Sequence, residues 1–207
     1  NTYTIAIQRQ EKGRGSNFMH NQISVGDRLV VGAPVNSFAL DRQADQVLLL
    51  AAGIGITPIV SMVKSLMRRK KQFSLIYCGR SKAHMAYADE LQTLCAERLH
   101  LHTSQTQGRL RLSSLLSQQA PNTQVYVCGP TSFIQEANQS AAVLKGPKAR
   151  LHQETFVSST QKGDTPFEVR LQRSQIQLKV GANESLLEAL CSLPTPVYWS
   201  CRRGECG

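Results

Sequence analysis

The sequence predicts a multidomain protein in which an α/β region is flanked by β-type segments. Between residues 44 and 157, apolar runs of strand length alternate with segments of helical periodicity, which is typical of βαβ units around a parallel sheet. Residues 1–43 and 166–207 instead show period-two alternation and turn signals. Residues 158–165 are polar and have the composition of a linker. We therefore expect three domains with these boundaries.

Length and composition place the chain among ordinary globular proteins. Its 207 residues suffice for one large or two small domains of about 100–200 residues each. A hydrophobic content of 41% and a charged content of 18% exclude a disordered tail, a collagen-like chain and a coiled coil. The longest apolar run, Val47–Pro58, is shorter than the roughly 18 residues of a membrane span, and no signal-peptide pattern opens the sequence. We expect a cytoplasmic protein with no membrane insertion.

The chain is strongly basic. It has 24 Lys and Arg against 14 Asp and Glu, a net charge of +10, which favours an acidic partner, an anionic ligand or nucleic acid. Its tight basic cluster, Arg68–Lys71, ends an expected helix, where such side chains suit the helix dipole. Because no aromatic stacking pattern accompanies the charge, we expect no nucleic-acid partner.

The first region is predicted to be β-type. Thr2–Ile7 alternates with period two, and Arg28–Val31 is expected to be a second strand after the turn Val25–Asp27. Between them, Gly13–Ser16 is a loop whose Ser16 can cap a short helix. The region is too small to close a barrel alone.

The central region carries five expected strands and four expected helices. Its first strand is apolar throughout, as expected of a strand buried on both faces. The expected strands are Val47–Ala52, Phe73–Cys78, His100–Thr103, Val125–Cys128 and Arg150–Phe156. The expected helices are Ile59–Met67, Tyr87–Ala96, Leu112–Gln118 and Phe133–Leu144.

The last region reads as a hairpin, a helix and a strand. Phe167–Leu171 and Ile176–Val180 form the hairpin, Ser185–Leu190 the short helix, and Val197–Trp199 the strand. Six cysteines in a chain of this length predict no disulfide framework. Four of them, Cys78, Cys95, Cys128 and Cys191, are interpreted as small buried hydrophobic residues.

A glycine-rich turn follows the first buried strand and precedes a helix. Gly53 and Gly55 allow a sharp turn and a close approach to a ligand, and the helix start offers free N–H groups to a pyrophosphate. Pro58 fits the first helical turn. The segment ends in Thr57-Pro58 and so departs from the usual dinucleotide fingerprint. By itself it is equally consistent with a plain strand–turn–helix connection.

A second turn, Cys128-Gly129-Pro130, ends the fourth expected strand. Because ligands of open parallel sheets bind outside the carboxyl ends of the strands, both glycine turns are expected at one edge. Alone, this would be an ordinary Gly-Pro turn. Together the two turns predict a nucleotide site.

In chain order, five motifs resemble those of the ferredoxin–NADP reductase-like flavoenzymes. They are Gly13–His20, Gly32–Leu40, Gly53-x-Gly55-x-Thr57-Pro58, Cys128-Gly129-Pro130 and His152–Phe156. The last resembles the end of the nucleotide domain in the phthalate dioxygenase reductase branch. The resemblance covers essentially the whole chain, and the motifs are specific jointly although each is weak alone.

The resemblance implies three domains and an electron-transfer function. Residues 1–43 would be part of a flavin-binding antiparallel β-barrel, residues 44–157 a Rossmann-like NAD(P)-binding domain, and residues 166–207 an incomplete β-grasp ferredoxin domain. It implies NADH as the electron donor, with NADPH left open, and FMN rather than FAD as the flavin. Electrons would pass through a [2Fe–2S] cluster to a terminal oxygenase, expected to be a Rieske-type aromatic-ring hydroxylase or O-demethylase.

The resemblance also assigns roles to residues. The reacting groups would be contacted by Thr57, Cys128, Glu154 and Phe156. The cofactor-binding residues would be Arg14, Gly15, Ser16 and Asn17 for the flavin phosphate, Gly53, Gly55, Thr57, Pro58, Cys128, Gly129 and Pro130 for the nucleotide, Arg80 for the adenosine ribose or a 2′-phosphate, and Phe156 for the flavin ring.

Cys201 and Cys206 have the spacing of the first two ligands of a plant-type [2Fe–2S] loop, C-x4-C-x2-C with a distant fourth Cys. The preceding hairpin and helix match a β-grasp ferredoxin. The third and fourth cysteines are absent, and the flavin-ring motif Arg-x-Tyr-Ser/Thr is expected upstream of Tyr3. We therefore expect a gene product about half as long again.

Two other functions stay open. The chain could be a fragment that binds nucleotide without flavin or cluster, and thus a binding module. It could also be an interaction protein built on a decayed reductase, although the intact glycine turns speak against this.

Overall fold

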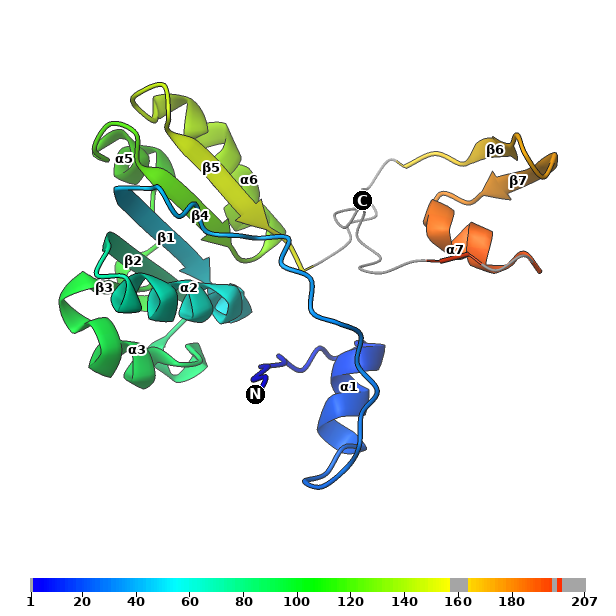
Figure 1. Ribbon diagram of the computed structural model, residues 1–207, viewed down its shortest axis with the longest axis horizontal. Coiled ribbons are helices and arrows are strands. Elements are labelled where there is room, and N and C mark those ends of the chain that lie inside the picture. The colour runs from blue at the N-terminus through cyan, green and yellow to red at the C-terminus, as the bar shows by residue number, and fades with distance from the viewer. Residues whose placement is uncertain (1, 157–163, 195–196, 199–207) are drawn as a thin grey trace. The chain divides into compact units, whose positions relative to one another are not determined.

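The computed structural model describes residues 2–156, 164–194 and 197–198. By its internal contacts the chain divides into two compact units, residues 1–156 and 157–207 (Figure 1). The first unit contains the central α/β region together with the segment before it, and the second contains the C-terminal hairpin.

A five-stranded parallel sheet forms the centre of the first unit, with strand order β3-β2-β1-β4-β5. All five predicted strands are confirmed, although β5 ends two residues before the predicted Phe156. The strands are β1 (Gln46–Ala52), β2 (Gln72–Gly79), β3 (Leu99–Thr103), β4 (Gln124–Cys128) and β5 (Arg150–Glu154). β1 is central because its apolar sequence can be buried on both faces.

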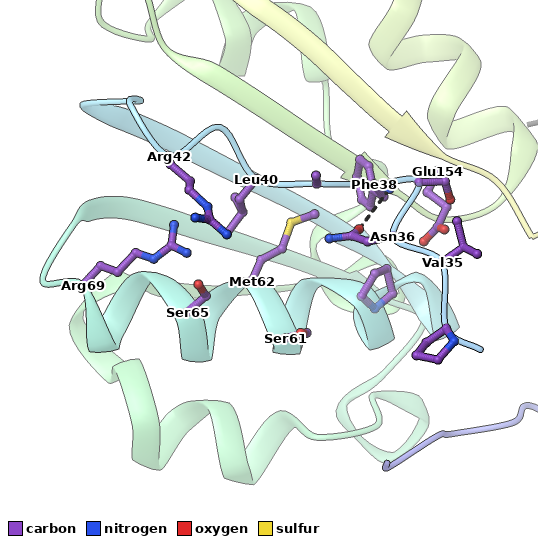
Figure 2. Close-up of a pocket in the computed structure, with 14 residues that line it drawn as sticks. Val35, Asn36, Phe38, Leu40, Arg42, Ser61, Met62, Ser65, Arg69 and Glu154 are labelled. Atoms are coloured by element: carbon purple, nitrogen blue, oxygen red, sulfur yellow. Dashed lines mark hydrogen bonds between the residues drawn. The ribbon is translucent and has the colours of Figure 1, made fainter. Parts of the chain in front are cut away.

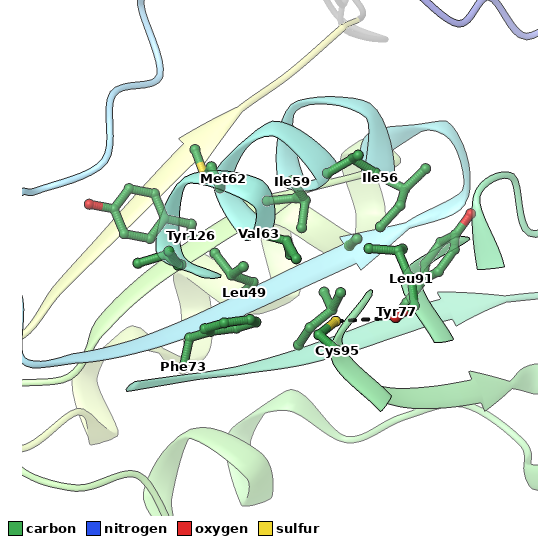
Figure 3. Close-up of a cluster of buried hydrophobic side chains, with 14 of the residues drawn as sticks. Leu49, Ile56, Ile59, Met62, Val63, Phe73, Tyr77, Leu91, Cys95 and Tyr126 are labelled. Atoms are coloured by element: carbon green, nitrogen blue, oxygen red, sulfur yellow. Dashed lines mark hydrogen bonds between the residues drawn. The ribbon is translucent and has the colours of Figure 1, made fainter. Parts of the chain in front are cut away.

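Helices cover both faces of this sheet (Figure 1). Successive side chains of β1 point to opposite faces, so Leu49 joins the apolar side chains of α2 and α3 (Figure 3), whereas Leu48 joins those of α5 and α6. The helices are α2 (Ile56–Arg68), α3 (Ala88–Cys95), α4 (Ser104–Gln107), α5 (Leu112–Ser117) and α6 (Thr131–Ser140), and the 3₁₀ turns are η1 (Gly53–Gly55), η2 (Lys82–His84), η3 (Ala96–Arg98) and η4 (Ala141–Val143). The predicted helix Phe133–Leu144 is thus α6 followed by a 3₁₀ turn.

The segment that leads into β1 is fastened to the sheet by Tyr126. The Tyr126 hydroxyl accepts the backbone N–H of Asp41 at 2.7 Å. The Tyr126 ring stacks on His152 of β5 with 4.5 Å between centroids, and packs against Phe38 on the same segment at 5.7 Å. His152 Nε2 lies 3.0 Å from Gln124 Oε1. Residues from three separate parts of the chain therefore form one contact.

Because His152 is part of this contact, we expect the folded protein to lose stability in mild acid. Burial, and to a lesser degree the nearby Arg150, lower the pKa of His152 from its usual 6.5, although Asp41 opposes the shift. Between the lowered pKa of the folded state and the usual value of 6.5, the unfolded chain binds more protons than the folded one. Stability therefore falls as the pH drops through this range. Urea denaturation at pH 7.5 and pH 5.5 measures the loss. In His152→Gln the loss should be smaller, and an unchanged pH dependence would contradict the assignment.

The β-type prediction for the first region is wrong in two segments. Neither Thr2–Ile7 nor Arg28–Val31 forms a strand in the described part of the chain. A strand requires a neighbour for its backbone N–H and C=O groups, and residues 2–43 supply none here. Ile5 is 70% exposed and Val31 is 76% exposed, so these apolar side chains lack a core to enter.

The predicted helix in this region is confirmed as α1 (Arg14–Asn21), but its start differs from the prediction. The N-cap is Gly13 and not Ser16, because the helix begins three residues earlier than an N-cap at Ser16 would place it. The Ser16 hydroxyl instead donates to the carbonyl of Gly13 at 3.3 Å and accepts the N–H of Gln10 at 3.1 Å.

The second unit contains the predicted hairpin and helix. β6 (Phe167–Leu171) pairs antiparallel with β7 (Ile176–Val180). α7 (Leu186–Cys191) starts with a capping box, in which Ser185 and Glu188 each accept the other's backbone N–H. Cys191 is exposed, so its interpretation as a buried residue is wrong: it is the last residue of this short helix.

Several predictions fall on residues that the structure does not describe. Cys201, Cys206 and Trp199 lie outside the described residues, as does most of the predicted linker 158–165. Val197 and Tyr198, the described part of the predicted last strand, have no regular secondary structure. Within the described residues, no helix combines the length and hydrophobicity needed to span a bilayer.

Candidate nucleotide-binding site

Both glycine turns lie at the carboxyl edge of the sheet, as predicted. β1 and β4 are neighbours, with Ala51 paired to Cys128 at their ends. The strand order reverses at this point, since β1 continues to β2 on one side while β4 continues to β5 on the other. In open α/β sheets, ligands bind in the crevice at such a switch point.

Gly55 and Gly129 bring the two turns into contact. A Cβ on Gly55 would lie 2.6 Å from the backbone N of Gly129 and would also overlap the Cys128 carbonyl. A Cβ on Gly129 would lie 2.9 Å from the Ala52 Cβ and 3.1 Å from the Phe133 ring. The absence of side chains at these two positions therefore allows close packing of protein against protein.

Gly53 has a different role. Its φ of +54° is a left-handed conformation that side chains rarely adopt, and an added Cβ would meet no atom within 4 Å. Its carbonyl accepts a hydrogen bond from the Tyr77 hydroxyl at 3.2 Å, and the Thr57 hydroxyl donates to the Ile54 carbonyl at 3.1 Å. Two hydrogen bonds therefore hold carbonyls of the turn, and the space that a side chain at residue 53 would enter is open.

A cleft of about 300 Å³ opens beside Gly53. It is lined from the ends of β1, β2 and β3 and from the start of α6. The residues are Ala52, Gly53, Cys78, Gly79, Arg80, His102, Ser104, Arg109, Leu110, Pro130, Ser132, Phe133 and Glu136. Three predicted site residues, Gly53, Arg80 and Pro130, are brought together here, whereas Gly55, Thr57, Cys128 and Gly129 support the turns behind.

The charged residues on one wall of this cleft were not predicted from the sequence. Arg109 Nη2 and Glu136 Oε2 form an ion pair at 2.9 Å, and Glu136 Oε1 accepts the backbone N–H of Leu112 at 3.2 Å. His102 Nε2 lies 2.9 Å from the Gly108 carbonyl. These contacts hold the segment after β3 against α6. The Gly108-Arg109 pair after β3 could have indicated this turn, but no local pattern singles out Glu136 within its helix.

Two cysteines, Cys78 and Cys128, lie at this edge of the sheet. Burial, with a smaller contribution from Glu136, raises the pKa of Cys78 to about 12, so its thiol is protonated at neutral pH. Cys128 is fully buried at the end of β4. Burial likewise raises the pKa of Tyr77 to about 12, which keeps its hydroxyl a hydrogen-bond donor to Gly53.

Glu154 lies at a second groove, of about 540 Å³, between the segment 34–42 and α2. Figure 2 shows Glu154 near Val35 and Asn36 at one end, and Arg42 and Arg69 at the other. Pro58 also lines this groove. Phe156, two residues beyond β5, is 41% exposed.

The predicted flavin-phosphate residues form the first turn of helix α1. Ser16 and Asn17 make hydrogen bonds within their own segment, and Asn17 Nδ2 donates to the Glu11 carbonyl at 3.2 Å. Arg14, Gly15, Ser16 and Asn17 line neither of the two clefts above. The described residues also contain no group of three His, Cys, Asp or Glu side chains placed to hold a metal ion.

Comparison with known proteins gives a consistent result. Residues 33–150 match the family model described as dimethylamine monooxygenase subunit DmmA-like, N-terminal domain. The chain is 41% identical over 206 residues to a heme-dependent oxidative N-demethylase beta subunit of Ectopseudomonas mendocina (strain ymp), covering 99% of this chain and 66% of that protein. It is 39% identical over 208 residues to a carnitine monooxygenase reductase subunit of Escherichia coli (strain K12), covering 99% of this chain and 64% of that protein.

Among solved structures, phthalate dioxygenase reductase superposes with a TM-score of 0.75 at 31% identity, covering 96% of this chain and 63% of that one. This shows that the predicted ferredoxin–NADP reductase-like α/β fold with its parallel sheet is correct. The chain spans about two thirds of the length of the curated relatives it matches.

Proposed function

Because the chain belongs to the DmmA-like family, we propose that it is the reductase part of a multicomponent oxygenase, an oxidoreductase that takes electrons from a nicotinamide nucleotide. The observation that carries the proposal is the Gly53 turn, which is open toward a cleft at the switch point of the sheet. Relatives named as reductase subunits of oxygenase systems support it.

The nucleotide-binding domain of the proposal covers residues 44–157. The pyrophosphate would approach the Gly53 turn and the start of α2, where Gly53 has no side chain in the way and the helix start offers N–H groups. Arg80 would meet the adenosine end in the cleft beside Gly53. Thr57 and Cys128 would orient the nicotinamide from the two turns, Thr57 through a hydroxyl held on the Ile54 carbonyl.

The flavin part of the proposal covers residues 1–43, with FMN preferred to FAD by the family resemblance. Arg14, Gly15, Ser16 and Asn17 would hold its phosphate, because the start of α1 exposes Arg14 and Gly15 at a helix N-terminus. Glu154 and Phe156, at the end of β5, would lie against its ring. When bound, a flavin supplies the conversion of a two-electron hydride transfer into single-electron steps.

The iron–sulfur part of the proposal rests on residues 166–207. The hairpin β6-β7 and the capped helix α7 agree with the hairpin and helix that a β-grasp ferredoxin would place before Cys201 and Cys206. Both cysteines would supply thiolates to a [2Fe–2S] cluster, which requires four.

For the partner we propose an oxygenase that demethylates an amine. The matched family is described by dimethylamine monooxygenase, and one relative is named an N-demethylase subunit. These names favour a methylated amine over the aromatic substrate that the resemblance alone suggested. NADH oxidation coupled to formaldehyde release from dimethylamine, in the presence of the cognate oxygenase, tests this choice.

The proposed reductase activity predicts a coloured protein. We expect the native protein to show flavin and iron–sulfur absorption bands that bleach when NADH is added under anaerobic conditions. NADPH in place of NADH measures the preference between the two donors. A colourless protein that still binds NADH would contradict the reductase and support the binding-module alternative.

A further inference from the structure

The nucleotide cleft has an unusual arrangement of charge. Dinucleotide-binding folds commonly carry an acidic residue beyond the second strand, which accepts a hydrogen bond from the ribose 2′-hydroxyl, or an arginine nearby, which accommodates a 2′-phosphate. Here the residue after β2 is Arg80, which forms no ion pair within the described residues. The carboxylate of the same cleft, Glu136, comes instead from α6.

Glu136 is held in a defined position. One carboxylate oxygen accepts from Arg109 Nη2 at 2.9 Å and the other accepts the Leu112 N–H at 3.2 Å. Its side chain is 27% exposed, whereas that of Arg109 is 72% exposed. The negative charge is therefore placed at the wall of the cleft before any ligand binds. The other titratable side chains that line the cleft are Cys78, Arg80, His102 and Arg109.

This position affects a 2′-phosphate and a 2′-hydroxyl in opposite ways. A phosphate group would meet a like charge at Glu136, and it would find Arg109 already paired. A hydroxyl can donate to a carboxylate oxygen, which has lone pairs to spare. Among the described residues, Arg80 is then the one arginine of the cleft without an ion pair. Alone, Arg80 would favour a 2′-phosphate, and the charge of Glu136 counteracts this preference.

On the basis of the proposed function, we propose that Glu136 is a specificity-determining residue that disfavours nicotinamide nucleotides with a 2′-phosphate. It supplies from α6 the acidic group that other dinucleotide-binding folds place beyond the second strand. The ion pair with Arg109 fixes this group and removes a cation that would otherwise attract the phosphate.

The test is a pair of dissociation constants, for NAD⁺ and NADP⁺, measured by titration calorimetry on the native protein. Glu136→Gln keeps an oxygen for the Leu112 N–H and loses the charge. It should bind NADP⁺ about tenfold more tightly relative to NAD⁺ than the wild type does. The matched control is Glu90→Gln on α3, which removes a carboxylate paired to Lys64 at 2.7 Å outside the cleft and should leave the ratio unchanged.

A second variant tests the opposite direction. Arg109→Gln leaves the Glu136 charge without its cation, so NADP⁺ binding should weaken relative to NAD⁺. Thermal melting confirms that each variant is folded, and either variant alone decides the question if the other is not. An unchanged ratio in folded variants that bind nucleotide would overturn the role of Glu136 and leave the reductase proposal intact. A wild-type protein that binds neither nucleotide would contradict both.

Discussion

Replacing Gly55 with alanine is expected to destabilise the protein by about 3 kcal/mol, because one added methyl group overpacks a contact between two backbone turns. The Cβ would lie 2.6 Å from the backbone N of Gly129, and neither turn can yield as a flexible side chain would. The melting temperature should fall by roughly 6–12 °C. Nucleotide binding should weaken as well, because the two turns would move apart.

Two other glycines are the controls for this result. Gly32→Ala places its Cβ in open space without a positive φ, so stability should change by less than about 0.5 kcal/mol. Gly53→Ala also meets no atom but carries a φ of +54°, so it should cost about 1 kcal/mol through backbone strain. If Gly55→Ala melted at the same temperature as Gly32→Ala, the close contact between the turns would be wrong.

Truncation of Leu49 to alanine is expected to cost about 3–4 kcal/mol. Leu49 is fully buried in the middle of β1, between Leu75 of β2 and Tyr126 of β4 in the sheet register. Figure 3 shows it in the cluster with Ile59 and Val63 of α2. Since β1 joins β2 and β3 on one side to β4 and β5 on the other, a cavity here should lower the stability of the whole first unit.

Urea denaturation measures this cost against Val31→Ala, whose side chain is 76% exposed and should change stability by less than about 0.5 kcal/mol. A similar midpoint for both variants would mean that β1 is not the centre of the core. A changed dependence on urea concentration would instead indicate that unfolding is no longer a single transition.

The elements that could be predicted from the sequence share a local cause. β1 and α2 each carry their burial pattern in consecutive residues, so the apolar run and the helical spacing locate them without knowledge of their neighbours. The wrong strand predictions in the first region also share a cause. The alternation of Thr2–Ile7 is a strand pattern, but a strand forms only when another segment pairs with it.

The residues of the candidate site also fall into those that a local sequence pattern predicts and those that it does not. Gly53 and the turn Cys128–Pro130 were predicted because each follows an apolar strand directly, and their meeting at one edge follows from parallel topology. Glu136 was missed because it is one polar residue of an ordinary helix, and its ion-pair partner Arg109 is distant in sequence.

The sequence by itself determined the parallel α/β core and the position of both glycine turns, because each depends on residues close together in the chain. It also carried the family resemblance, through motifs that are specific jointly. The tertiary structure decided which glycine borders open space and which packs against protein, since Gly53 and Gly55 are alike in sequence and differ in φ and in their neighbours. It also decided the charge of the cleft. Electrostatic interactions depend on distance in space, and folding brings Glu136, Arg109 and Arg80 to one cleft from three separate parts of the chain.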